Sequence, residues 1–131
     1  MLQGTKSRGV SLAETLIAMV VLSIAVFAVL SVNSYCLRAA STNKNYQIAN
    51  LLATTELGLA ESVLKINFFA PDADIATPKI ASNQFPGFSF IVDDVKFEDP
   101  ARNLRHVRVR VFWLERGVER QYALSTTFYN Y

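Results

Sequence analysis

An uncharged apolar run near the start of the chain limits what this sequence can fold into more than any other feature. Residues 15–32, TLIAMVVLSIAVFAVLSV, contain no charged side chain, no proline and no glycine. As a helix the run would be about 27 Å long, close to the roughly 30 Å hydrocarbon core of a bilayer. Its serines, Ser23 and Ser31, can donate hydrogen bonds to carbonyls of their own helix. The sequence therefore predicts one unbroken helix that can cross a membrane.

Length and composition leave room for one small domain beside this run. The chain has 131 residues, of which 18% are charged, and its formal net charge is +2. This balance argues against a nucleic-acid partner, because nucleic-acid-binding proteins carry a basic patch with interleaved aromatic residues. Cys36 is the only cysteine, so no internal disulfide is expected.

Two simple interpretations fit the apolar run incompletely. A secretory signal peptide has an apolar stretch of about 7 to 15 residues that ends in small residues at a cut, whereas Tyr35 and Cys36 follow the run here. A single-pass anchor would be oriented by Lys6 and Arg8, with the N-terminus in the cytoplasm and the rest outside. The anchor leaves Glu14, at the edge of the run, unexplained.

The stretch RGVSLAETLIAMVVLSIAVFAVL resembles the N-terminus of type IV pilins and of the related pseudopilins of type II secretion. In that family a short basic leader ends in glycine, and an apolar helix follows with a glutamate at the fifth position after the glycine. The corresponding residues here are Gly9 and Glu14. The resemblance implies that a prepilin peptidase cuts between Gly9 and Val10 on the cytoplasmic side. In this family the same enzyme methylates the new amine, most often on a phenylalanine, where this chain has Val10.

A physical argument gives Glu14 a role that agrees with the resemblance. An ionisable group costs about 2.5 to 3.5 kcal/mol at the centre of a membrane, so a partner is expected for one at its edge. Cleavage would create that partner, because the α-amino group of Val10 lies one helical turn from Glu14. Between staggered helices Glu14 can also face the amine of an adjacent subunit. We interpret Glu14 as the residue that sets the stagger during assembly; the alternative is a glutamate that only extends to the lipid headgroups.

Beyond the run, the sequence stays compatible with a helix to about Ile66. A helix that began at residue 10 would then be about 85 Å long. Asn43 and Asn45 have low helix propensity, so a bend or partial melting is expected there. Pro71 ends the pattern, and residues 71–87 are expected to form a loop. Apolar positions spaced by three and four residues predict a stripe that faces a core, formed by Ile48, Leu51, Leu52, Thr55, Leu59 and Val63.

From Phe88 onward the apolar period changes to two. The segments FSFIVDDVKF, HVRVRVFWL and RQYALSTTFYNY predict three or four antiparallel strands, and the turn ERGV joins the last two into a hairpin. Arg105, Arg108 and Arg110 are expected on the solvated face of the middle strand, opposite its valines and Trp113. The predicted fold class is α+β, with a long N-terminal helix packed on a small antiparallel sheet.

No pattern in the chain predicts catalysis, a cofactor or a metal site. His106 is the only histidine, and no nucleophile and acid accompany it at a recognisable spacing. A single cysteine excludes zinc-binding spacings. We interpret the acidic pairs as solvated loop charges and not as a calcium site. These pairs are Asp72 with Asp74, Asp93 with Asp94, and Glu98 with Asp99.

The sequence thus predicts a minor structural subunit of a type IV pilus-like filament, active in filament initiation or at the tip. Its expected partners are the prepilin peptidase, other pilin or pseudopilin subunits and the bacterial inner membrane, which it crosses once with a periplasmic head. A minor pseudopilin of a type II secretion system and a membrane-anchored periplasmic binding module are the alternatives. The predicted segments are the leader 1–9, the transmembrane and filament-core helix 10–35, the amphipathic helix 36–70 and the loop and sheet 71–131.

Overall fold

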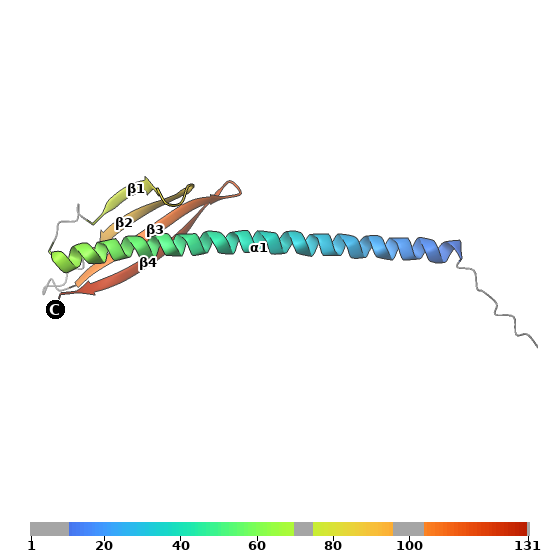
Figure 1. The fold of residues 1–131 in the computed structure, drawn as a ribbon, viewed down its shortest axis with the longest axis horizontal. Coiled ribbons are helices and arrows are strands. Elements are labelled where there is room, and N and C mark those ends of the chain that lie inside the picture. Colours follow the sequence, from blue (N-terminus) through green and yellow to red (C-terminus); the bar gives the residue numbers. More distant parts are fainter. Residues whose placement is uncertain (1–10, 70–74, 96–103, 131) are drawn as a thin grey trace, which may run out of the picture. The chain divides into compact units, whose positions relative to one another are not determined.

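The computed structural model describes residues 11–69, 75–95 and 104–130, in which one helix precedes four strands (Figure 1). The strands form one antiparallel sheet in the order β1-β2-β3-β4. This arrangement confirms the predicted α+β class. The chain divides into two units, Met1–Ser41 and Thr42–Tyr131, and we call the second the head unit. The elements are α1 (Leu12–Ile66), β1 (Thr77–Ala81), β2 (Phe88–Val95), β3 (Leu104–Glu115) and β4 (Val118–Tyr129).

Helix α1 is continuous through Asn43 and Asn45, so the expected partial melting does not occur. A carboxylate of the sheet compensates for the low helix propensity of this segment. The Thr42 hydroxyl donates to Glu115 Oε1 at 2.9 Å, and the Asn45 side-chain amide donates to the same oxygen at 3.4 Å. Contacts that form only in the folded head unit therefore favour helix where local preference does not.

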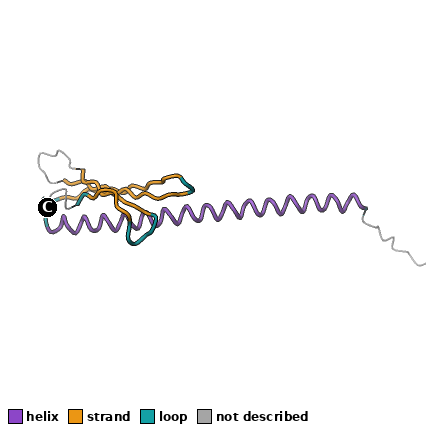
Figure 2. The backbone as a smooth tube through the Cα atoms, turned by 90° about the horizontal axis from the view of Figure 1, so that it is seen from above, coloured by secondary structure: helices purple, strands orange, loops and turns teal. Residues whose placement is uncertain are grey.

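Within the head unit the sheet lies along the C-terminal part of α1 (Figures 1 and 2). Three alanines of the helix are buried, and their small side chains let the sheet approach the helix backbone closely. Three leucines on the same face of the helix are buried beside them. The buried helix positions are Ala49, Leu52, Ala53, Leu57, Ala60 and Leu64. Their partners in the sheet are Phe88, Phe90, Val92, Val107, Val109, Val111 and Trp113.

The prediction of which helix positions face the core was only partly correct. Leu52 is buried and Ile48 and Val63 are partly buried, as predicted. Leu51 and Leu59, however, are 55% and 57% exposed, and Thr55 is exposed as well. The face centred on the alanines meets the sheet instead, since a helix packs closest where its side chains are smallest.

Strand β3 alternates as predicted over residues 107–113. Val107, Val109, Val111 and Trp113 are buried, while Arg108 on the opposite face is exposed. Trp113 packs edge to face on Tyr46, with ring centroids 5.1 Å apart, and stacks on Phe88 at 5.8 Å. These aromatic contacts join the helix to the two central strands, β2 and β3.

The hairpin between β3 and β4 was predicted correctly, whereas β1 was not. Glu115 pairs with Val118 across a two-residue turn in which Arg116 and Gly117 have φ values of 53° and 77°. Positive φ at both central positions is typical of the type I′ turn that closes tight hairpins. Strand β1 forms inside the segment expected to be a loop. It is short, it contains Pro78, and it is a strand only because β2 pairs with it.

Candidate functional site

The first turn of α1 holds Glu14 in a capping box. The Glu14 backbone N–H donates to Ser11 Oγ at 3.2 Å, and the Ser11 backbone N–H donates to Glu14 Oε2 at 3.3 Å. The sequence SLAE supplies the serine at the N-cap and the glutamate three residues later that this motif requires. The acid also lies where the helix dipole favours negative charge. Glu14 Oε1, in contrast, accepts no hydrogen bond from residues 11–69, 75–95 or 104–130.

Sequence reasoning missed the contribution of Ser11, although the serine three residues before Glu14 was a readable signal. Ser11 satisfies the N–H of Glu14 and begins the helix, and its carbonyl accepts from the Thr15 N–H at 3.2 Å. Glu14 therefore has a local structural role in addition to the proposed role in assembly. Gly9 and Val10, the other predicted site residues, lie outside the described residues.

The apolar part of α1 is uncovered on every side. Met19, Val20, Val21 and Leu22 are consecutive and therefore point in all directions around the helix, yet each is 59% to 65% exposed. A helix that is apolar all round is stable only where lipid or other apolar surfaces surround it. By length and composition, α1 is the one described helix that can cross a membrane, and none of its most apolar stretch is buried within the chain.

The hydroxyl groups in this stretch need no hydrogen-bond partner outside the helix. Ser23 Oγ donates to the Met19 carbonyl at 2.8 Å, and Ser31 Oγ donates to the Phe27 carbonyl at 2.9 Å. Both bonds confirm the expectation that these serines bond within their own helix. Both serine hydroxyl donors therefore already have acceptors, and the surface of the run can pack against either lipid or a neighbouring helix.

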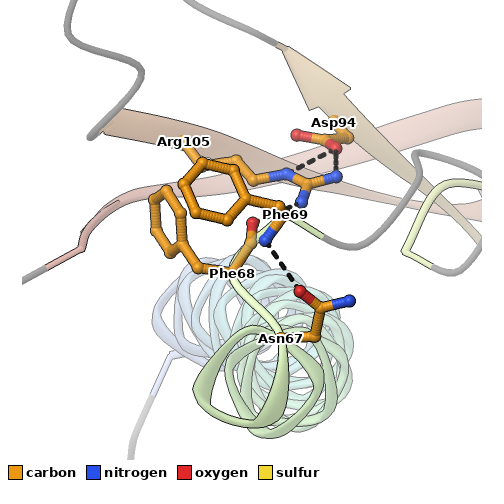
Figure 3. Close-up of polar contacts among 5 residues, drawn as sticks. All are labelled: Asn67, Phe68, Phe69, Asp94 and Arg105. Atoms are coloured by element: carbon orange, nitrogen blue, oxygen red, sulfur yellow. Dashed lines mark hydrogen bonds and ion pairs between the residues drawn. The ribbon is translucent and has the colours of Figure 1, made fainter.

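At the other end of α1, Arg105 joins the end of the helix to the sheet (Figure 3). Its Nη1 donates to the Phe68 carbonyl at 2.8 Å, and its Nε donates to Asp94 Oδ2 at 2.9 Å. The Asp94 side chain is fully buried, and that of Arg105 is 5% exposed. Asn67 Oδ1 accepts from the Phe69 N–H at 3.2 Å, which closes a turn just after the helix. The expectation that Arg105 is solvated was wrong.

Several other charged residues of the sheet form ordinary structural pairs. Asp93 Oδ2 accepts from Arg110 Nε at 2.9 Å on the solvated face, opposite the face that carries Asp94. The two acids therefore cannot chelate one ion. Among the residues described, no three His, Cys, Asp or Glu side chains are grouped to hold a metal. His106 Nδ1 lies 3.1 Å from Thr127 Oγ1, a contact between neighbouring strands. The acidic pairs at 72 and 74 and at 98 and 99 lie outside the described residues.

A groove of about 220 Å³ lies in the head unit beside α1, β1 and β2. Its lining is mostly apolar and includes Leu52, Leu59, Ile80 and Phe90, but it also contains the carboxylate of Glu56. Burial raises the pKa of Glu56 above the usual value of a glutamate side chain, because desolvation disfavours the charged form. Folding thus works against ionisation at this position.

Replacing Glu56 by glutamine is expected to stabilise the head unit at pH 7 but not at pH 4. The folded state holds the Glu56 proton more tightly than the unfolded state, so wild-type stability falls as pH rises from 4.5 through the folded-state pKa. Glutamine removes this loss. Urea unfolding at both pH values, followed by Trp113 fluorescence, measures the difference. Glu61→Gln is the control: it breaks the exposed 2.7 Å pair with Lys65 and should lower stability by about 0.3–0.5 kcal/mol. Equal effects of Glu56→Gln at pH 4 and pH 7 would contradict this prediction.

The described part of the predicted site thus consists of one carboxylate, which takes part in a capping box, and an exposed apolar helix surface beside it. Its chemistry is that of packing and charge pairing. No protein-family model, curated protein or solved structure was found to match this chain.

Proposed function

We propose that this chain is a minor structural subunit of a type IV pilus-like filament, cleaved by a prepilin peptidase and assembled through its N-terminal helix. The observation that carries the proposal is the apolar surface of α1 over residues 15–32, which lies uncovered beside a single carboxylate in the first turn. Lipid covers this surface while the chain is anchored in the inner membrane with a periplasmic head. In the filament, the helices of other subunits take the place of lipid.

The proposed assembly step changes the surroundings of the helix but not its structure. Lipid tails and apolar side chains are similar environments, so close packing and a few polar contacts decide which helices associate and how. The internal hydrogen bonds of Ser23 and Ser31 are unaffected by the transfer. Glu14 is the only charged side chain from Ser11 to Leu37, so it is the group that can select one stagger among many.

Glu14 selects the stagger through its need for a positive partner. In the uncut chain, its Oε2 accepts from the Ser11 N–H. Cleavage between Gly9 and Val10 would add a charged amine nearby, and the amine of a neighbouring subunit is a partner for Oε1. An unpaired charge in apolar surroundings is costly, so a stagger that pairs Glu14 with an amine is favoured over the others.

The N-terminal sequence and intact mass of the chain, purified from membranes of cells with and without an active prepilin peptidase, test this proposal. We expect the chain to begin at Val10 only where the peptidase is active, and the intact mass shows whether Val10 also carries a methyl group. The control is Gly9→Leu, which should leave the chain beginning at Met1 even when the enzyme is present. A wild-type chain that begins at Met1 in both strains would exclude the filament subunit and leave a single-pass anchored module.

A further inference from the structure

Glu56 is an acid of the head unit that has no positively charged partner among the described residues. Its side chain is half buried on α1, and the described part of the chain provides it with neither a hydrogen bond nor an ion pair. The helix positions one turn away, where an ion-pair partner would lie, are Leu52, Ala53, Leu59 and Ala60. All four are apolar, so α1 itself cannot neutralise this carboxylate.

The other acids that the structure describes in the head unit are all paired. Each has a lysine or an arginine within ion-pair distance; these acids are Glu61, Asp93, Asp94, Glu115 and Glu119. Glu61 shows the usual arrangement on this helix, because Lys65 lies one turn further along and its Nζ is 2.7 Å from Glu61 Oε1. Partial burial of Glu56 without a counter-charge costs folding free energy, which a bound cation would offset.

The groove of about 220 Å³ beside α1, β1 and β2, which we call the Glu56 groove, has apolar walls around this carboxylate. Leu52 and Phe90 in its lining are buried, whereas Leu59 and Ile80 are 57% and 42% exposed. Ile80 pairs with Phe90 across the sheet, so both side chains lie on the face toward α1. Two large apolar side chains, one from the helix and one from β1, are therefore in contact with solvent beside an unpaired charge.

Further lining of the Glu56 groove comes from the segment after β1 and carries hydrogen-bonding groups. Asn83 and Gln84 are exposed, and their side-chain amides make no hydrogen bond with any described residue. An amide can both donate and accept, which is what the backbone of an extended peptide requires of a partner. A ligand that fills the groove thus meets one negative charge, apolar walls and two amides.

We propose that the Glu56 groove binds the side chain of a lysine in an extended segment of a partner protein. The ammonium group pairs with Glu56, the aliphatic stem covers Leu59 and Ile80, and the backbone beside the lysine bonds to the two amides. Lysine fits better than arginine, because Glu56 is the only charged residue among those described in the lining. One carboxylate suits the three donors of an ammonium group better than the five of a guanidinium group.

A second copy and a free amine each meet only part of these requirements. In a second copy, Lys65 and Lys79 of the head unit are already held in ion pairs. Lys44 lies within α1, where backbone N–H and C=O groups bond to one another, so they cannot bond to the amides of the groove. A free alkylamine has no backbone. All the described lining belongs to the head unit, so the inference does not depend on the membrane helix or on filament assembly.

NMR titration of the full chain in lipid nanodiscs tests the proposal. The probe is a capped glycine peptide with lysine at its centre, and the comparison peptide carries norleucine, which has the same aliphatic stem without the amine. We expect the lysine peptide to shift the methyl resonances of Leu59 and Ile80 and to bind at least about tenfold more tightly than the norleucine peptide. The corresponding arginine peptide and free butylamine should both bind more weakly than the lysine peptide.

Glu56→Gln is the decisive variant, because it keeps the shape of the side chain and is expected to fold at least as stably as the wild type at pH 7. It should lower the affinity for the lysine peptide at least about tenfold and leave that for the norleucine peptide unchanged. Glu61→Gln, which removes a carboxylate elsewhere on the same helix, should bind both peptides as the wild type does. Leu59→Ala, at an exposed position of the wall, should weaken the binding of both peptides alike.

Equal binding of the lysine and norleucine peptides would overturn the proposal, and so would a Glu56→Gln variant that binds the lysine peptide normally. Butylamine that binds as tightly as the peptide would identify a free amine as the ligand. A dimer in sedimentation that Glu56→Gln abolishes would identify a second copy as the partner; either result contradicts the proposed partner. None of these measurements involves prepilin cleavage, so failure of this inference is distinguishable from failure of the proposed function.

Discussion

Replacing Glu14 by glutamine is expected to lower incorporation of the chain into filaments at least about tenfold, while membrane insertion is retained. Glutamine can still accept the Ser11 N–H, so the capping box and the start of α1 are preserved. The negative charge that would pair with an amine is lost. Insertion should be as good as before or better, because a charged group is removed from the membrane edge. Quantitative immunoblotting of sheared filaments and of the membrane fraction measures both effects.

Ser11→Ala separates the two roles of Glu14. It removes the hydroxyl that accepts the Glu14 N–H and should cost about 0.5–2 kcal/mol of local helix stability, but it leaves the carboxylate in place. We therefore expect Ser11→Ala to assemble nearly as well as the wild type. If Glu14→Gln assembled normally, or if both variants failed equally, the carboxylate would have only its capping role and the proposed stagger mechanism would be wrong.

Replacing Arg105 by alanine is expected to destabilise the head unit by about 3–5 kcal/mol, the range for breaking a buried ion pair by removing one partner. Asp94 would remain fully buried without its cation, and the Phe68 carbonyl would lose its donor. Each kcal/mol lowers the Tm of a domain of this size by about 4–8 °C. Thermal and urea unfolding of the full chain in micelles, followed by the fluorescence of Trp113, the only tryptophan, gives the change directly.

Arg108→Ala is the matched control, because Arg108 lies on the same strand but on the exposed face. Its effect should stay within about 0.5 kcal/mol. The double variant Asp94→Leu with Arg105→Met should recover much of the lost stability, since apolar residues of similar volume often replace a buried ion pair without loss. An Arg105→Ala variant as stable as Arg108→Ala would show that the buried pair contributes nothing.

Arg105 illustrates where sequence reasoning failed. Its position two residues before Val107 places it on the buried face of β3, whereas its charge by itself favours the solvated face. The deciding partner, Asp94, lies in β2 directly opposite Val107. The acid is therefore one step along the same face from Arg105. That proximity exists only once β2 and β3 pair in this register, so periodicity within one strand could not have shown it.

The prediction of which face of α1 is buried in the head unit was partly wrong for a related reason. Large apolar residues mark a stripe in the sequence, yet Leu51 and Leu59 face outward, and Ala49, Ala53 and Ala60 face the sheet. Alanine is a weak indicator of burial when it is counted by hydrophobicity alone. It becomes the best choice only when the backbone of the helix must approach a sheet, which is a property of the packed pair of elements.

The sequence by itself determined the features that depend on local chemistry. An uncharged run of apolar residues predicts a helix that requires apolar surroundings. The period of two predicts strands β2 to β4, and the Arg116–Gly117 pair predicts the hairpin between β3 and β4. Only the tertiary structure decided which side of the helix is buried, which arginine is enclosed, that β1 joins the sheet and that β4 is the last of the described strands at the opposite edge. Each of these depends on contacts between segments that are distant in sequence. Such contacts stabilise the chain only when the helix and the sheet pack together.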